Sequence, residues 1–309
     1  MTTNVLRSAL IALSQNKQLR SFAEQSRMGQ KMSGRFIAGM HASDALRVAE
    51  TLNREGIPVS LDSLGENVST EEEARRAADI YHQLLDEIQK RGLKANISAK
   101  LTQMGMHISP AIARQITSEL VDHAAATGNF LRVDMEGSDL TQTTIDMTRE
   151  IHAQPNCADH IGTVLQSYLY RCEEDVNLLL ADRIRIRLCK GAYKEPPTLA
   201  FPEKADVDAN YLKLSKILLT SGVFHGLATH DEVIIREIKK FVEQEGIDKR
   251  SFEFQMLYGI RRDLQTSLAK EGYGMRVYIP FGTEWYPYFM RRLAERPANV
   301  LFIVKNLFK

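Results

Sequence analysis

Two adjacent arginines near the end of the chain, Arg291 and Arg292, have the spacing that most directly suggests chemistry. They follow an apolar stretch containing Tyr278 and a glycine turn, which predicts a strand, a turn and then a helix. Two neighbouring guanidinium groups on a helix can bind a carboxylate through paired hydrogen bonds. Glu295, one turn later, offers the alternative of a solvated charge pair on the helix surface. Spacing alone leaves both interpretations open.

Two lysines, Lys100 and Lys190, each follow a β-like run. A lysine at a strand end can form a Schiff base with a carbonyl substrate, as in an aldolase or lyase, or bind a carboxylate or phosphate as a cation. Lys190 is followed by Gly191 and Ala192, whose small side chains would let backbone N–H groups approach a phosphate. Periodicity does not choose between these roles.

The fifth β-like run alternates arginine with apolar residues, at Arg183, Arg185 and Arg187. Because side chains two positions apart share one face of a strand, these arginines are expected to point into a barrel interior. An unpaired buried guanidinium is too costly, so they need acidic partners or an anionic ligand. The acidic candidates on other strands are Asp134, Glu136 and Glu253. Structural ion pairs and contacts with a bound cofactor are both compatible with this pattern.

Eight β-like runs alternate with segments of helical period. The runs cover residues 59–62, 95–101, 130–135, 161–166, 184–188, 226–229, 252–256 and 275–279. Thr70 and Glu73 have the spacing of a capping box before one helical segment. Eight such units predict a (β/α)8 TIM-like barrel, in which the strand ends carry the site. An open doubly wound sheet is the alternative, but the glycine-rich turn that typifies it is missing.

The chain is predicted to be a single domain of residues 1–309, with a helical arm over 1–50 and the barrel over 55–305. A net charge of +1 gives no long-range field for nucleic acid. The histidines show no metal-ligand spacing, and no apolar run is long enough to span a membrane. Three cysteines without disulfide spacing favour a reducing, cytoplasmic location.

Eight segments in order along the chain resemble the proline dehydrogenase family, in its single-function bacterial form. They are 61–66, 98–101, 133–136, 165–168, 187–193, 228–230, 252–257 and 278–295. The resemblance implies a distorted (β/α)8 barrel that holds FAD across its mouth. It also implies oxidation of L-proline to Δ1-pyrroline-5-carboxylate, the first step of proline degradation to glutamate, with electrons passing to a membrane quinone. A peripheral contact with the inner face of the cell membrane is compatible with that acceptor.

The resemblance also assigns substrate-binding roles. Lys100, Arg291 and Arg292 would hold the proline carboxylate. Asp62 would position Lys100, and Glu295 would pair with Arg292. The walls of the pyrrolidine ring would be Tyr193, Leu257 and Tyr278. Because tyrosine at position 278 would crowd a 4-hydroxyl group, proline is expected rather than hydroxyproline.

Asp134 and Arg187 would be the catalytic residues, both beside the flavin. The other cofactor contacts implied are Met135, Gln166, Lys190, Gly191, Ala192, Thr229 and His230. In this chemistry a hydride leaves C5 of proline for flavin N5, and a cation such as Arg187 favours the negative charge that develops on the ring. Proline's own amine can lose its proton to water, so no strong general base is required. A Schiff-base lyase and a non-catalytic barrel that binds an acidic ligand remain the rival hypotheses.

Overall fold

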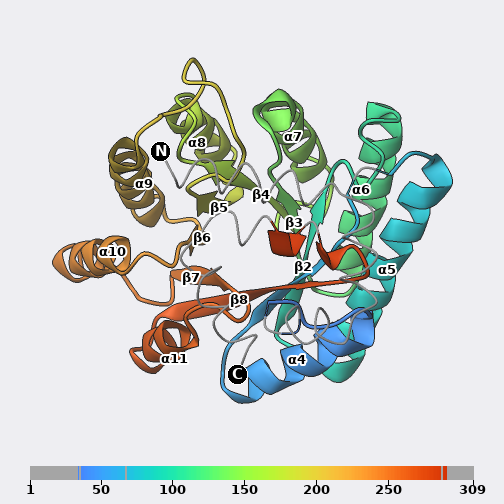
Figure 1. Cartoon of the computed structure of the whole chain (residues 1–309), viewed down its shortest axis with the longest axis horizontal. Coiled ribbons are helices and arrows are strands. Elements are labelled where there is room, and N and C mark those ends of the chain that lie inside the picture. The colour runs from blue at the N-terminus through green and yellow to red at the C-terminus, as the bar shows by residue number, and fades with distance from the viewer. Residues whose placement is uncertain (1–33, 35, 67, 287, 291–309) are drawn as a thin grey trace, which may run out of the picture.

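The computed structural model of the chain describes residues 34, 36–66, 68–286 and 288–290, which form a closed barrel of parallel strands surrounded by helices (Figure 1). The strands are β1 (Val59–Ser63), β2 (Ala95–Lys100), β3 (Leu131–Asp134), β4 (Ile161–Gln166), β5 (Arg185–Cys189), β6 (His225–Ala228), β7 (Phe252–Leu257) and β8 (Gly274–Phe281). The helices are α4 (Ala42–Arg54), α5 (Glu71–Arg91), α6 (Pro110–Ala126), α7 (Ser138–His152), α8 (Cys172–Ala181), α9 (Lys204–Leu219), α10 (Glu232–Gln244) and α11 (Arg262–Lys270).

The barrel closes because β1 pairs with β8, in a register that places Val59 opposite Val277 and Ser63 opposite Phe281. Every other strand pairs in parallel with the next one along the chain, so the strand order is the sequence order. The predicted (β/α)8 barrel is therefore confirmed, and the open doubly wound sheet is wrong. The first and last residues of each predicted strand differ by at most two positions from those of an observed strand.

One detail of the fifth strand was predicted wrongly. Arg183 does not extend the alternation, because it has φ 57° in the turn that joins α8 to β5. Its side chain is exposed, and the strand begins only at Arg185. The left-handed turn rotates the chain between helix and strand, so the period of two breaks at that point.

The helices begin and end where local chemistry favours it, as α5 shows. The Thr70 hydroxyl accepts a hydrogen bond from the Glu73 backbone N–H at 3.2 Å, and the Glu73 carboxylate accepts one from the Thr70 N–H at 3.3 Å. This confirms the predicted capping box. The helix ends at Gly92, whose left-handed backbone (φ 61°) accommodates the turn toward β2.

The apolar core lies between the strands and the surrounding helices. Outward-facing strand residues such as Leu61, Ile97 and Phe254 are fully buried in it, together with the apolar faces of the helices. The alternate strand positions point into the barrel, and there the side chains are largely polar, as with Ser60 and Arg187. The interior of this barrel is therefore a polar layer enclosed by an apolar one.

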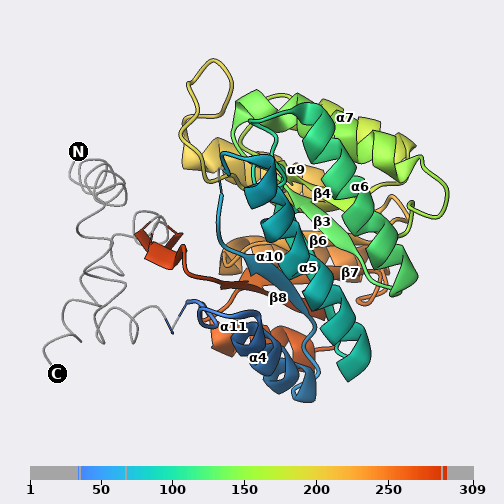
Figure 2. The same cartoon turned by 90° about the vertical axis from the view of Figure 1, so that its right-hand side faces the viewer.

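The chain leaves the barrel at the carboxyl end of β8 (Figure 2). Residues 285, 286 and 288–290 then pack with Phe36, Ile37 and Leu64 in a second apolar cluster beside that end. Of the predicted arm over residues 1–50, the described part includes the start of α4. The division into an arm and a barrel stays a prediction.

Candidate active site

A buried ion pair joins β1 and β2 at the carboxyl end of the barrel. Lys100 Nζ lies 3.4 Å from both carboxylate oxygens of Asp62 and 3.6 Å from Oε1 of Glu66. The side chains of Lys100 and Asp62 are only 11% and 1% exposed. Burial alone would lower the pKa of Lys100, but the charges of Asp62 and Glu66 raise it well above its usual range. The ammonium therefore stays charged and is held toward β1.

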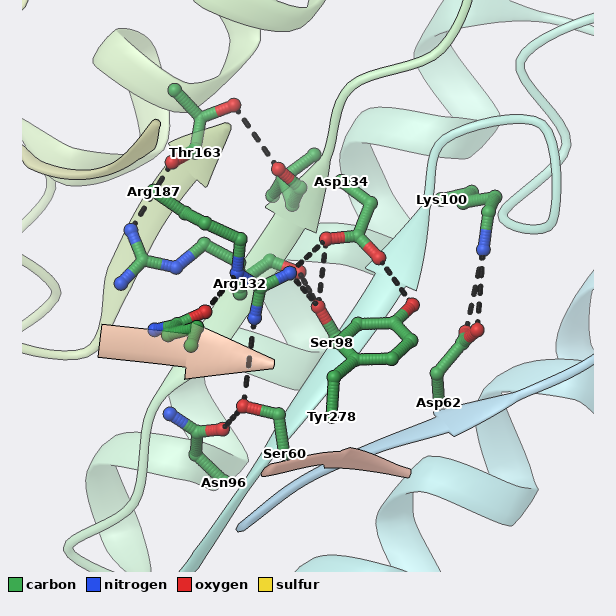
Figure 3. A network of polar contacts seen from close by, with 12 residues as sticks. Ser60, Asp62, Asn96, Ser98, Lys100, Arg132, Asp134, Thr163, Arg187 and Tyr278 are labelled. Atoms are coloured by element: carbon green, nitrogen blue, oxygen red, sulfur yellow. Dashed lines mark hydrogen bonds and ion pairs between the residues drawn. The ribbon is translucent and has the colours of Figure 1, made fainter. Parts of the chain in front are cut away.

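Arg187 on β5 is the centre of a network that crosses the barrel interior (Figure 3). One of its terminal nitrogens donates to Asp134 Oδ1 at 2.7 Å and to Ser98 Oγ at 3.1 Å, and Nε donates to Gln255 Oε1 at 2.5 Å. The other terminal nitrogen lies 3.5 Å from Ser60 Oγ. Because Arg187 is only 4% exposed and bonds to residues from four other strands, its guanidinium is fixed in position.

Tyr278 on β8 completes this network by donating a hydrogen bond from its hydroxyl to Asp134 Oδ2 at 2.7 Å. Its ring also lies against the Arg187 guanidinium, 5.1 Å from ring centre to Cζ. Burial, reinforced by the charges of Asp134 and Asp62, raises the pKa of Tyr278 well above its usual range. The hydroxyl therefore remains a donor, and both oxygens of Asp134 are engaged.

Behind Arg187, two residues of β7 extend the network. Gln255 Nε2 donates to Glu253 Oε1 at 2.6 Å, and Arg276 Nε donates to the same oxygen at 2.7 Å. Gln255 thus joins a carboxylate on one side to Arg187 on the other. The sequence shows Gln255 and Ser98 as polar residues at inward positions of apolar strands, but it gives no sign that both bond to Arg187.

The three acidic residues expected to pair with the inward arginines each make different contacts. Arg187 pairs with Asp134, whereas Glu253 pairs with Arg276. Glu136 contacts no arginine in an ion pair among the described residues, and accepts hydrogen bonds from the backbone N–H and the hydroxyl of Thr102 instead. Burial raises the pKa of Glu136.

Among the described residues, those assigned to substrate and those assigned to the cofactor lie on two different arcs of the barrel mouth, except that Tyr193, assigned to substrate, follows β5 on the cofactor arc. The others assigned to substrate lie on β7, β8, β1 and β2, which are neighbours across the closure of the barrel; they are Leu257, Tyr278, Asp62 and Lys100. Those assigned to the cofactor lie on, or directly after, β3 to β6; they are Asp134, Met135, Gln166, Arg187, Lys190, Gly191, Ala192, Thr229 and His230. A cofactor along one arc would face a substrate on the other.

On the cofactor arc, the donors nearest the barrel axis suit a flavin ring. Gln166 is buried, and its Nε2 donates to the Glu136 backbone carbonyl at 2.9 Å, which fixes the amide. Met135 beside it is also buried. An amide, a guanidinium and a thioether are the kinds of side chain that offer a flavin hydrogen bonds and apolar contact.

The outer end of this arc is held by ion pairs. Lys190 Nζ lies 2.5 Å from Asp208 and 2.9 Å from Asp231. Although burial acts to raise it, the pKa of Asp231 falls to about 2 because of Lys190. A phosphate at Lys190 would have to displace one of these carboxylates.

Two further residues of the cofactor arc have contacts of their own. A Cβ on Gly191 would lie 2.3 Å from the Tyr168 ring, so packing on Tyr168 requires glycine there. His230 Nε2 accepts a hydrogen bond from the Leu257 backbone N–H at 2.9 Å, which links β6 to the end of β7.

Tyr193 lies in the segment between β5 and α9, with 38% of its surface exposed. Arg291, Arg292 and Glu295 lie outside the described residues, so the structure does not test the proposed carboxylate fork. Among the residues that are described, no group of three or more His, Cys, Asp or Glu side chains could hold a metal ion. In the same part of the chain, no helix is long and apolar enough to cross a membrane.

Comparisons with known proteins agree on one family. The family described as proline dehydrogenase matches residues 45–305. A protein of Bacillus subtilis subsp. natto named proline dehydrogenase 1 is 39% identical over 307 residues, which is 99% of this chain and 100% of that protein. A proline dehydrogenase of Deinococcus radiodurans is 40% identical over 316 residues and is matched over the full length of both chains.

A solved structure shares the fold. Proline utilization A from Bdellovibrio bacteriovorus, inactivated by N-propargylglycine, superposes with a TM-score of 0.82 at 24% identity. The match covers 94% of this chain and 36% of that longer one. Because the family match and the full-length relatives agree with a barrel whose carboxyl end holds the expected charged side chains, this chain belongs to the proline dehydrogenase family.

Proposed function

We propose that this protein oxidises L-proline to Δ1-pyrroline-5-carboxylate with FAD as its cofactor and a membrane quinone as the final electron acceptor. The observation that carries the proposal is the network of Arg187, Asp134 and Tyr278 beside the pair of Lys100 and Asp62, at the carboxyl end of a barrel in this family. It provides a fixed cation next to a place for a carboxylate.

The residues on β3 to β6 would hold the cofactor. Arg187 and Gln166 would bond to the flavin ring, with Asp134 and Met135 alongside, and Lys190, Gly191, Ala192, Thr229 and His230 would lie along the remainder of the molecule. When bound, FAD supplies the acceptor for the hydride that leaves C5 of proline.

The residues on the other arc, together with Tyr193 from the segment after β5, would bind the substrate. Lys100 would donate to the proline carboxylate together with Arg291 and Arg292, while Asp62 keeps the ammonium charged and oriented. Glu295 would orient Arg292 in the same way. Leu257, Tyr278 and Tyr193 would enclose the pyrrolidine ring. Fixing the carboxylate at one end and the ring faces on either side sets the distance of C5 from its acceptor, which replaces a random collision by a prepared geometry.

Arg187 would stabilise the negative charge that develops during the oxidation. Its bonds to Asp134, Ser98 and Gln255 hold the guanidinium before substrate arrives, so little reorganisation is needed at the moment of reaction. Both oxygens of Asp134 already accept hydrogen bonds. Asp134 therefore acts as an anchor for Arg187 and Tyr278, and the substrate amine loses its proton to water.

We also propose that the chain works as one domain in the cytoplasm and meets its quinone through a peripheral contact with the inner face of the membrane. The family match supports these features. The described part of the chain contains no helix long and apolar enough to cross a membrane.

An absorbance spectrum of the purified protein tests the central proposal. FAD would give a band at about 450 nm, which should bleach when L-proline is added without oxygen and should not bleach with D-proline. A Schiff-base lyase would instead be trapped on a lysine by borohydride with a carbonyl substrate. Correctly folded protein that takes up no flavin would exclude the proposal, and flavin that proline does not reduce would leave only a binding function.

A further inference from the structure

A concave site lies at the amino-terminal end of the barrel, opposite the strand ends that carry most of the candidate active site. A pocket of about 800 Å³ is lined by residues just before, or in the first half of, all eight strands. Its lysine, arginine and acidic lining residues are Lys94, Arg132, Asp159, Arg185, Glu253 and Arg276. Active sites of such barrels lie at the carboxyl end, so a strongly charged pocket at the amino-terminal end needs a separate explanation.

The cations of this pocket outnumber its anions. Four of the lining side chains are lysine or arginine, and two are acidic. Glu253 is the buried one of the two, and its Oε1 already accepts from both Arg276 and Gln255. Asp159 lies 3.4 Å from Arg185, but its side chain is 84% exposed, so water weakens that pair. The pocket therefore carries an excess of about two positive charges with little local compensation.

Arg132 shows most directly that the pocket has more positive charges than acidic partners. It is 3% exposed and lines the pocket, yet it has no acidic hydrogen-bond partner among the described residues. One terminal nitrogen donates to the backbone carbonyls of Thr163 and Arg185 at 3.1 and 2.6 Å. Within the described part of the chain, no acceptor lies within hydrogen-bond distance of its buried Nε. A buried guanidinium in this state costs free energy that a nearby anion would recover.

An aromatic ring holds two of these cations together. The Phe130 ring lies 4.7 Å from Arg132 Cζ and 5.4 Å from Arg185 Cζ. Cation–π contacts of this kind fix the two guanidinium groups without neutralising their charge. Burial, followed by the repulsion from Arg187 and Arg276, lowers the pKa of Arg132 well below its usual range. The like charges are thus held close to one another by the fold.

We propose that the amino-terminal opening of the barrel is a binding site for a small dianion, a phosphoryl group or a dicarboxylate, held by Arg132, Arg185 and Arg276. A dianion matches the charge excess of the lining, and guanidinium groups bind both phosphate and carboxylate oxygens through paired hydrogen bonds. None of its three arginines belongs to the proposed catalytic or cofactor contacts, and the side chain of Arg276 is linked to Arg187 through Glu253 and Gln255.

Binding is tested on the FAD-loaded protein with inorganic phosphate and with malonate, each at pH 7.5 and compared with sodium chloride at equal ionic strength. We expect either dianion to raise the melting temperature in a saturable way, because a ligand that binds only the folded state stabilises it. Isothermal calorimetry then gives the affinity, and the stronger of the two probes tells a phosphoryl ligand from a dicarboxylate. If neither dianion exceeds chloride in both measurements, the proposal is wrong.

Variants locate the site. Arg185→Gln removes a partly exposed cation at the edge of the pocket and should weaken binding of the dianion at least tenfold. The control is Arg236→Gln on α10, which removes an arginine away from the pocket, more exposed than Arg185 (62% against 35%), and should leave the affinity unchanged. Equal affinities in wild type and Arg185→Gln would overturn the proposal. Should Arg185→Gln fold poorly, Lys94→Gln at the rim provides the same comparison, with a loss of affinity of about threefold or more expected.

Discussion

Replacing Lys100 by methionine tests the proposed anchor for the proline carboxylate. Of the three cations assigned to that anchor, Lys100 is the one within the described residues. Methionine keeps the length and much of the volume of the side chain but removes the ammonium that lies 3.4 Å from Asp62. Burial raises the pKa of Asp62 to about 6, with Lys100 opposing that effect and Asp134 adding to it. In the variant the opposing charge is gone, so the pKa of Asp62 rises further and the carboxyl group takes up a proton.

The magnitude follows from what the substrate loses. A hydrogen bond from an ammonium to a carboxylate contributes about 1.5–3 kcal/mol, and each 1.4 kcal/mol corresponds to about a factor of ten. KM for L-proline should therefore rise by about tenfold to about a hundredfold. Breaking a buried ion pair can cost up to about 3–5 kcal/mol of stability, but protonation of Asp62 keeps the loss below that range at pH 7.

The assay is steady-state reduction of a dye by L-proline, with flavin content measured on the same samples. Lys100→Arg is the matched control, because it retains a cation and should keep measurable turnover with a smaller increase in KM. A change in KM of less than about threefold in Lys100→Met would refute the anchor. Complete loss of turnover in Lys100→Arg, with flavin still bound, would favour the Schiff-base role of this lysine instead.

Three further changes have defined outcomes. Tyr278→Phe removes the hydrogen bond to Asp134 but keeps the ring, so the free energy of unfolding in urea should fall by about 1–3 kcal/mol; an unchanged value would contradict the contact. Thr70→Ala removes the cap of α5 and should cost about 1 kcal/mol, whereas Thr70→Ser should cost less. Burial lowers the pKa of His225 to about 3, so the folded state stays unprotonated at pH values where the unfolded chain binds a proton. Stability should therefore decrease as the pH falls from about 6.5 toward 3, and His225→Gln should flatten this dependence; equal slopes would count against it.

Much of the fold could be predicted because each signal is local. Alternating polar and apolar residues determine a strand, and the cap at Thr70 and the glycine at position 92 determine where α5 begins and ends. The exception, Arg183, shows the limit of a pattern. The alternation of arginine with apolar residues in the sequence extends back to Arg183, before the strand begins. The left-handed backbone at Arg183 takes that residue out of the strand.

The candidate site could be predicted only in part, because its contacts join distant parts of the chain. The inward position of Arg187 follows from alternation in β5. Its partners Ser98 and Asp134 are 89 and 53 residues away, and they meet it only because closure of the barrel sets the register of every strand. The role of Gln255 is hidden for the same reason. The assignments to substrate and cofactor came from the family resemblance rather than from the pattern of residues.

The buried charges at the two ends of the barrel have different surroundings, and the difference suggests why the interior is polar. An apolar interior of the same volume would often be more stable than buried charges, so the charges have to be explained by something other than stability. Near the carboxyl end, Arg187 has a carboxylate, a hydroxyl and an amide as acceptors, which fixes its charge where an electron-rich ring would lie. Near the amino-terminal end, Arg132 is equally buried, but the only acceptors it meets within the described part of the chain are backbone carbonyls. The same barrel thus gives Arg187 side-chain acceptors but gives Arg132 backbone carbonyls, and an anion from solution would supply the acceptor that Arg132 lacks.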